Sequence, residues 1–348
     1  MNKFFLLLKQ LLLLTCLVTC IGIANGQVRR FSFTREKMGS PFKLVMYTSD
    51  SSQAIRLANG CFHLVDSLNG IYSDYLATSE LGELNAAALQ APVTISLSPA
   101  LWNMLQLAAR AYQLSGGAFD ITVGALSKFW RLQRAAGQFP RTLSAQVMRK
   151  ATGFNKLRFN DTLHTIYIPV AGMQLDLGGI AKGAIAGEAQ RYLLANGVAS
   201  SLIDAGGDIV AGPPPPGNDG WTIGINVPGT TNQLIATRLR LSNKAVATSG
   251  DVYQFLQHKG KRYSHIIDPR TGLGVTSQRN VTVIAADGAT ADWLATACSI
   301  LSIKKAKKLA DQFNAALLIT VMHKHRLQRV QNKWMANYLR SAVEKQPS

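Results

Sequence analysis

The amino-acid sequence predicts an α+β protein, and three observations support this class. Hydrophobic residues make up 47% of the 348 residues and charged residues 16%, a composition that favours a large buried core over disorder. Helix-like and strand-like patterns both occur but do not alternate steadily, as they would around a doubly wound parallel sheet. Short β-type runs recur from residue 221 to 286, which indicates an antiparallel or mixed sheet.

The first 26 residues (1–26) are expected to form a signal peptide. Two lysines precede an apolar run at 11–24, which is too short to span a bilayer comfortably, and Ala24-Asn25-Gly26 supplies the small residues that a signal peptidase recognises. A lipid anchor on Cys20 is the alternative, although the residue before it fits a lipidation motif poorly. We therefore expect export to the periplasm, either as a soluble protein or as an inner-membrane lipoprotein.

The first half of the mature chain is expected to hold one strand and two helices. Residues 42–48 alternate β-branched and aromatic residues, which predicts a strand. Apolar residues recur at helical spacing over 52–68. The next helix begins at Ser98-Pro99, where the serine can cap the first turn and the proline fits inside it, and Gly116 ends it.

The middle of the chain combines short strands with a helix that follows two glycines. A helix near 144–152 is expected to lead into paired strands at 156–160 and 164–169. Gly178-Gly179 then precedes a helix with a buried apolar stripe, and Asn196-Gly197 ends that helix.

The C-terminal half is expected to complete the sheet and to add two helices. A strand at 201–204 comes before the β-type runs. Helices at 290–302 and 304–313 follow them, and a strand at 315–321 is expected to be the last element.

Positive charge is in clear excess. There are 37 Lys and Arg against 19 Asp and Glu, which gives a net charge of +18. Such a surface attracts phosphate groups, nucleic acid or anionic lipid. The sequence has neither zinc-finger spacing nor the aromatic motif of RNA-binding domains, so we expect no nucleic-acid recognition.

One domain is expected to fill most of the mature chain. It spans 27–322 and consists of two subdomains, and we treat 323–348 as a basic C-terminal extension with no assigned role. Removal of the signal peptide leaves Cys61 and Cys298. Both lie in apolar, helical surroundings, which predicts buried free thiols rather than a disulfide framework.

Residues 176–183 form a glycine-rich turn at the start of a predicted helix. Glycines let a ligand approach the backbone, and the unpaired N–H groups of a helix N-terminus favour a phosphate. Lys182 can add positive charge. The alternative is a tight strand-to-helix turn without a ligand, and the segment alone leaves both interpretations open.

Asp292 and Thr296 lie one helical turn apart, so their side-chain oxygens can face one cation. A carboxylate with a hydroxyl suits Mg²⁺, which keeps several waters and shares the phosphates of its substrate. The alternative is an acidic residue favoured by the helix dipole, with the threonine merely packed.

Two further segments have the residue types of a ligand site. A predicted strand carries His265 to a Pro-Gly turn, where an imidazole can accept a proton, although a hydrogen-bonded turn histidine fits equally well. Residues 116–120 expose backbone beside Phe119, which suits a flat ligand. The alternative there is a glycine that stops a helix next to a buried phenylalanine.

Taken together and in this order, these segments resemble the ApbE family of FAD:protein FMN transferases, exported flavin-handling enzymes of bacteria. The likeness runs from residue 38 to residue 297, nearly the whole mature chain. The matching segments are Met38–Ser40, Ser73–Tyr75, Ser79–Leu81, Gly116–Asp120, Asp176–Gly183, Gly206–Asp208, Ser249–Asp251, His265–Gly272 and Ala291–Ala297. The resemblance implies a T-fold-like architecture of mixed or antiparallel sheets flanked by helices, with a ligand cleft between the subdomains.

The resemblance also implies a reaction. FAD would be split at its pyrophosphate, FMN would be joined through a phosphoester to a threonine of an acceptor flavoprotein of the cell envelope, and AMP would be released. Phosphoryl transfer of this kind depends on positioning and on neutralisation of charge by a metal ion. Two alternatives remain open: a Mg²⁺-dependent FAD pyrophosphatase that releases FMN and AMP, and a non-catalytic periplasmic FAD-binding protein.

The site residues follow from the same resemblance. Mg²⁺ is assigned to Asp292, Thr296 and the backbone carbonyl of Ala181, and the base that receives the threonine proton to His265. Some family members have a second acidic ligand where this chain has Ala295, which leaves one coordination position to water. The residues matched to the FAD site are Met38, Tyr75, Ala118, Phe119, Asp120, Gly178, Ala184 and Ile267.

Overall fold

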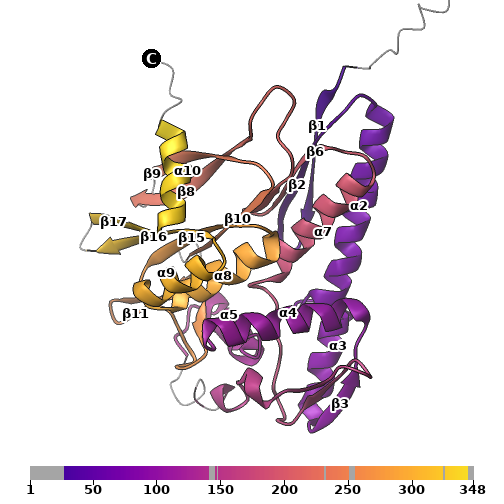
Figure 1. Cartoon of the computed structure of the whole chain (residues 1–348). Helices are drawn as coiled ribbons and strands as arrows, with labels where there is room; N and C mark the ends of the chain where they lie inside the picture. The colour runs from indigo at the N-terminus through magenta and orange to yellow at the C-terminus, as the bar shows by residue number, and fades with distance from the viewer. Residues whose placement is uncertain are drawn as a thin grey trace, which may run out of the picture.

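An antiparallel sheet runs through the upper half of the protein as drawn in Figure 1. The structure is a computed structural model that describes residues 27–140, 146, 148–230, 233–250, 255–323 and 326–343. Within those residues the sheet has eight strands in the order β1-β2-β6-β7-β10-β15-β16-β17. They are β1 (Arg29–Lys37), β2 (Ser40–Thr48), β6 (Ser200–Ala205), β7 (Asp208–Ala211), β10 (Lys244–Gly250), β15 (Arg279–Ala285), β16 (Ala316–His323) and β17 (Arg326–Gln331).

Both faces of this sheet are buried, because alternate residues of its strands enter two different cores. In β2, Leu44 and Met46 belong to the larger core, while Val45 packs into a smaller core on the opposite face. In β15, Val283 and Ile284 divide between the two cores in the same way. The period of two is that of side chains along a strand, which point to opposite faces in turn.

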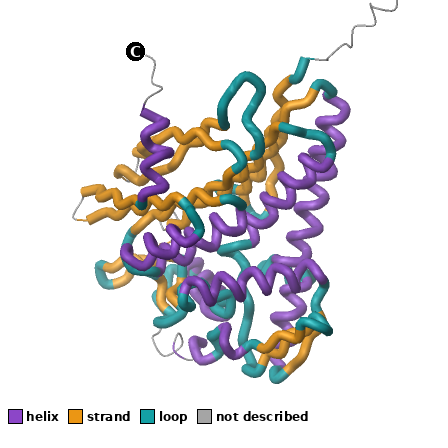
Figure 2. The backbone as a smooth tube through the Cα atoms, viewed as in Figure 1, coloured by secondary structure: helices purple, strands orange, loops and turns teal. Residues whose placement is uncertain are grey.

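Helices cover one face of the sheet, and a hairpin with one helix covers the other (Figures 1 and 2). The helices on the larger core are α2 (Ser51–Tyr72), α7 (Ala181–Ala195), α8 (Gly288–Ile300) and α9 (Ile303–Gln312). On the smaller core lie β8 (Trp221–Thr230), β9 (Gln233–Leu241) and α10 (Lys333–Val343).

Side-chain caps fix where several of these helices begin. The Asp50 carboxylate accepts the Ser52 N–H at 2.8 Å before α2, and the Asp287 carboxylate accepts the Thr290 N–H at 2.8 Å before α8. Such a cap satisfies an amide that has no partner inside the helix. In contrast, Ile180 precedes α7 and offers no side-chain cap, and the Gly183 N–H in the first turn donates to Asp292 of α8.

A smaller layer of helices and short strands continues the larger core below the sheet as drawn in Figure 1. Trp102 and Ile166 of this layer belong to the same hydrophobic cluster as Leu44 of the sheet, so the two parts share one core. Its elements are α3 (Glu80–Ala87), the 3₁₀ turn Ala88–Gln90, β3 (Val93–Ser96), α4 (Pro99–Ser115), α5 (Gly124–Ala135), the 3₁₀ turn Phe154–Lys156, β4 (Arg158–Asn160) and β5 (Thr165–Ile168).

Two short hairpins pack against α5. They are β11 (Phe255–His258) with β12 (Lys261–Ser264), and β13 (Ile267–Asp268) with β14 (Leu273–Gly274). Trp130 of α5 forms a small core with Leu256 and Ile267. Its indole N–H also donates to the Gly272 carbonyl at 3.0 Å. These contacts hold the segment around residue 265 next to α5.

The structure confirms the α+β class and most of the expected elements. The expected helix at 52–68 lies within α2, and α4 begins at Pro99 after a Ser98 cap and ends before Gly116, which has a left-handed φ of 61°. Cys61 and Cys298 are buried free thiols, as predicted. No helix in the described part of the chain is both long and apolar enough to cross a membrane.

The expectation that the strand at 315–321 is the last element is wrong. β17 follows it and pairs with β16, and α10 then packs on the smaller core. Exposed basic residues such as Lys333 stand beside buried apolar residues such as Met335 in this region. The sequence therefore resembles a basic tail although its apolar residues are packed in the core. Two other expectations fall outside the described residues: the signal peptide at 1–26 with Cys20, and part of the helix near 144–152.

Candidate active site

The start of α7 is the centre of the site. The chain before α7 is joined to the 121–124 segment, because the Asp176 N–H donates to the Ile121 carbonyl at 2.7 Å. Within the glycine turn itself, the Asp176 carboxylate accepts the Gly178 N–H at 2.7 Å. α7 has no side-chain cap of its own. Its Ala181 N–H donates to the Leu177 carbonyl at 2.9 Å, and its Gly183 N–H donates to Asp292 Oδ2 at 3.1 Å.

Two glycines allow α7 and α8 to meet backbone to backbone. A Cβ built on Gly183 would lie 2.1 Å from the Gly288 carbonyl oxygen and 2.8 Å from the Asp292 Cβ. A Cβ on Gly288 would lie equally close to the Gly183 carbonyl oxygen. No other residue type fits at such a distance, so these glycines bring Asp292 against the first turn of α7.

Thr296 lies against the glycine turn that precedes α7. A Cβ built on Gly179 would be 2.9 Å from Thr296 Oγ1 and 3.2 Å from the Phe119 ring. Within residues 291–300, which the structure describes completely, every residue is buried except Thr296, which is half-buried. Asp292 thus contacts Gly183 and Thr296 lies against Gly179, two residues after and two residues before Ala181 in the chain, and Thr296 is the less buried of the two side chains.

One ammonium and two buried carboxyl groups lie near one another at this junction. The ammonium of Lys182 lies 3.1 Å from Asp208 Oδ2, at the start of β7. Burial raises the pKa of the Asp292 carboxyl well above its usual range, repulsion from Asp208 adds to the rise, and Lys182 and the Gly183 amide oppose it. Burial also raises the pKa of Asp208, against the attraction of Lys182. One ammonium thus faces two buried carboxyl groups.

The donor set at this junction fits a hard divalent cation. Among the described residues no group of three or more His, Cys, Asp or Glu side chains is placed to hold a metal ion. The set predicted from the sequence does not need one, because it comprises a carboxylate, a hydroxyl and a backbone carbonyl. Oxygen ligands of this kind, completed by water and phosphate, suit Mg²⁺. A cation would favour the ionised form of Asp292, which burial disfavours.

The 116–120 segment is held by its own hydrogen bonds. Asp120 Oδ1 accepts the Thr122 N–H at 2.8 Å and the Thr122 hydroxyl at 2.6 Å, and Oδ2 accepts the Phe154 N–H at 3.2 Å. Burial raises the pKa of Asp120, while these hydrogen bonds oppose the rise. Ala118, Phe119 and Asp120 are all buried, so both oxygens of the carboxylate serve to shape the loop beneath the glycine turn.

Tyr75, one of the predicted FAD-site residues, is largely exposed. Its side chain is 76% exposed, and the Arg131 guanidinium carbon lies 4.0 Å from the centre of its ring. Arg131 also forms an ion pair with Asp74 at 2.5 Å. The pairing of Arg131 with Asp74 leaves no local signal in the sequence, because it joins α5 to a loop far from it in the chain.

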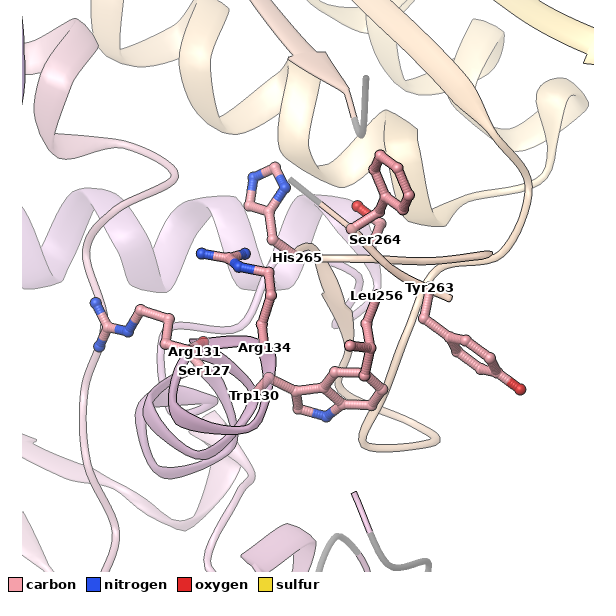
Figure 3. Close-up of a pocket in the computed structure, with 9 residues that line it drawn as sticks. Ser127, Trp130, Arg131, Arg134, Leu256, Tyr263, Ser264 and His265 are labelled. Atoms are coloured by element: carbon pink, nitrogen blue, oxygen red, sulfur yellow. The ribbon is translucent and has the colours of Figure 1, made fainter. Parts of the chain in front are cut away.

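His265 is exposed at the rim of a small hollow between α5 and the β11–β12 hairpin (Figure 3). The hollow combines positive charge with aromatic rings, and Figure 3 shows Arg134 extending toward His265. Its lining residues are Ser127, Trp130, Arg131, Arg134, Phe255, Leu256, Tyr263, Ser264 and His265. Because Arg131 lines the hollow and also covers Tyr75, this arginine connects the surroundings of His265 with the loop that carries Tyr75.

The remaining predicted residues occupy different surroundings. Met38 has a left-handed φ of 52° in the turn between β1 and β2 and packs partly on the larger core, as does Ala184 in the first turn of α7. Gly178 is exposed in the glycine turn. Ile267 is buried in the small core with Trp130, where it supports the β13–β14 hairpin rather than an open surface.

Solved structures share this architecture. The flavin transferase ApbE from Vibrio cholerae superimposes with a TM-score of 0.79 over 90% of this chain and 100% of its own, at 24% identity. The apo form of the flavinyl transferase ApbE from Pseudomonas stutzeri gives a TM-score of 0.79 over 90% of this chain and 97% of its own, at 25% identity. The α+β fold is thus that of the solved ApbE proteins.

Sequence relatives extend across the same region. An FAD:protein FMN transferase from Treponema pallidum (strain Nichols) is 32% identical over 86% of this chain and 87% of its own. Another from Klebsiella pneumoniae (strain 342) is 30% identical over 80% of this chain and 84% of its own. The model of the ApbE family matches residues 38–319, which include the glycine turn, the 116–120 segment, His265 and α8. This protein therefore belongs to the ApbE family.

Proposed function

We propose that this protein is an exported, Mg²⁺-dependent FAD:protein FMN transferase that modifies a threonine of an envelope flavoprotein. The names of its relatives support the transferase activity. One structural observation carries the proposal: Asp292 accepts the Gly183 N–H while Thr296 lies against Gly179, and these two glycines flank Ala181 in the chain. A charge-bearing junction of this kind at a helix N-terminus suits the diphosphate of a dinucleotide.

The residues of the junction divide the work of holding the substrate. Asp292, Thr296 and the Ala181 carbonyl would hold Mg²⁺, which when bound neutralises negative charge on the FAD diphosphate. The positive end of the α7 dipole and the Lys182 ammonium attract the phosphate oxygens. Asp208 fixes that ammonium through its ion pair.

The transfer itself exchanges one phosphorus–oxygen bond for another. The hydroxyl oxygen of the acceptor threonine bonds to the FMN phosphorus, and the bond from that phosphorus to the bridging oxygen breaks. AMP leaves with the bridging oxygen. His265, exposed at the rim of the hollow beside α5, accepts the proton of the threonine hydroxyl.

The test is incubation of the purified protein with FAD, MgCl₂ and a threonine-bearing acceptor domain, followed by mass spectrometry of the acceptor and chromatography of the nucleotides. Transfer predicts an acceptor heavier by one FMN residue (FMN less one water) and an equal amount of AMP. An acceptor whose threonine is replaced by alanine is the control and should gain no mass. Release of FMN and AMP without an adduct would instead show a pyrophosphatase, and intact FAD would show a binding protein.

Export is the second part of the proposal, and the 1–26 segment supports it by sequence alone. Mass spectrometry of the N-terminus of the protein recovered from its own cells distinguishes the two routes. A chain that begins at Gln27 indicates a soluble exported protein. A lipid-modified Cys20 indicates a lipoprotein, and an intact Met1 contradicts export.

A further inference from the structure

Arg131 on α5 covers one face of the Tyr75 ring. The guanidinium carbon lies 4.0 Å from the ring centre, within the range of a cation–π contact. The Tyr75 side chain is 76% exposed, so the protein core does not fix its orientation. An exposed aromatic ring with one face covered by a guanidinium leaves its other face to a planar ligand.

Asp74 holds Arg131 in this position. Their ion pair is 2.5 Å long. The Asp74 side chain is only 9% exposed and the Arg131 side chain 23% exposed, so water screens the pair weakly. The Asp176 carboxylate, at the start of the glycine turn, is also close enough to act electrostatically on both Arg131 and Asp74. Arg131 therefore joins α5, the loop after α2 and the glycine turn.

Hydrogen bonds within the Tyr75 loop hold its backbone in addition to the ion pair between Asp74 and Arg131. The buried Ser79 hydroxyl donates to the Leu76 carbonyl at 2.8 Å and accepts the Gly82 N–H at 2.9 Å. The Tyr75 N–H donates to the Ser73 hydroxyl at 3.2 Å. Loss of Arg131 should thus release the Tyr75 ring without unfolding the loop that carries it.

We propose that Arg131 is a positioning residue that holds the Tyr75 ring ready to stack on the isoalloxazine of FAD, an inference that rests on the proposed function. A ring that is already oriented loses less conformational freedom when the flavin binds. Asp74 acts one step further away, because it orients the guanidinium. Arg131 contributes to FAD affinity through Tyr75 and not through a contact of its own with the phosphates.

A double-mutant cycle on the full chain tests this mechanism. FAD binding is measured without Mg²⁺, so that no turnover occurs, by the quenching of flavin fluorescence on an aromatic side chain. Arg131→Met and Tyr75→Ala should each weaken FAD binding by about threefold to tenfold and reduce the quenching. The double variant should bind as Tyr75→Ala alone does. Additive losses would overturn the inference, because Arg131 would then contact FAD itself.

Arg131→Lys serves as a second variant if the methionine variant does not fold. Lysine keeps a charge beside Asp74 but lacks the planar group that lies over the ring, so it should lower FAD affinity while leaving the unfolding temperature unchanged. Wild-type affinity in both Arg131 variants would refute the positioning role. The matched control is Arg240→Met, which removes an arginine paired with Asp219 outside the site and should leave FAD affinity unchanged.

The outcome also separates this inference from the proposed function. If the unmodified protein does not bind FAD, the proposed function fails and the inference fails with it. If the unmodified protein binds FAD and modifies its acceptor, but the Arg131 variants match it in affinity and quenching, only the inference fails.

Discussion

Gly183 of α7 and Gly288 of α8 are in backbone contact, and a Cβ on either would lie 2.1 Å from the carbonyl oxygen of the other. The same contact seats Asp292 on the first turn of α7, where its carboxylate accepts the Gly183 N–H. The candidate metal ligands are therefore positioned by the absence of two side chains, and not only by the residues that would touch the ion.

Gly183→Ala should destabilise the protein through this contact. The added methyl group meets the backbone of α8, which cannot move aside as a flexible side chain can, so the free energy of unfolding should fall by about 3 kcal/mol. Urea denaturation followed by circular dichroism measures the change.

The control is Gly187→Ala in the same helix, where a Cβ meets nothing within 4 Å. That variant should keep or slightly raise the stability, because alanine favours a helix. Equal stability of the two variants would contradict the close approach of α7 and α8.

Asp292→Asn should separate metal binding from folding. Asp292 and Asp208 are both buried near a single lysine, so a bound cation would favour the ionised form of Asp292 that burial disfavours. Asparagine cannot ionise and keeps the size of the side chain. We expect MgCl₂ to raise the unfolding temperature of the wild type but not of the variant, and FMN transfer to fall at least 100-fold. Differential scanning calorimetry with and without MgCl₂ measures the first effect. Ala295→Gly, in the same helix, keeps both proposed side-chain ligands and should retain the response to Mg²⁺.

The two thiols predict a loss of stability in alkali. Burial raises the pKa of both Cys61 and Cys298 from an ordinary value of 9.0 to about 12, so the folded protein keeps thiol protons that the unfolded chain releases. The free energy of unfolding should then decrease between about pH 9 and pH 12, by about 1.4 kcal/mol per pH unit for each thiol. Urea denaturation at pH 8 and pH 10 measures the decrease. Cys61→Ala should remove about half of the contribution that the two thiols make to this pH dependence. An unchanged slope would contradict a raised pKa of the Cys61 thiol.

Local patterns were sufficient to predict the elements that surround the site. The Ser98-Pro99 start, the Gly116 stop and the apolar stripe of α2 each depend on interactions within a few residues, and the structure reproduces all of them. β17 and α10 were missed for the opposite reason. Their burial depends on β16 and on the β8–β9 hairpin, which are distant in the sequence or become neighbours only in the folded protein. In the sequence alone, the basic residues of this region outweigh the few apolar residues that these contacts bury.

The site shows the same limit. The sequence pointed to Asp292 and Thr296 from their helical spacing, but their place beside the glycine turn depends on the contact between Gly183 and Gly288, which no spacing reveals. Arg131 and Asp74 were missed because an ion pair between distant segments leaves no local pattern. In general, the chemistry of single residues could be predicted here, whereas pairs that form across the fold required the structure.

His265→Ala should impair transfer more than substrate binding. His265 is exposed at the rim of the hollow and is not a member of the small core that Trp130, Leu256 and Ile267 form, so its replacement should leave the fold and FAD affinity unchanged. Loss of a general base lowers kcat by about 100-fold to 10,000-fold. Rates of acceptor modification at saturating FAD, together with the dissociation constant of FAD, measure the two effects separately.

The control is His258→Phe in the neighbouring hairpin, which keeps the ring that stacks on Phe139 at 4.0 Å and should retain activity. Because a proton acceptor acts only in the chemical step, equal losses of FAD affinity and kcat in His265→Ala would assign His265 to substrate binding instead.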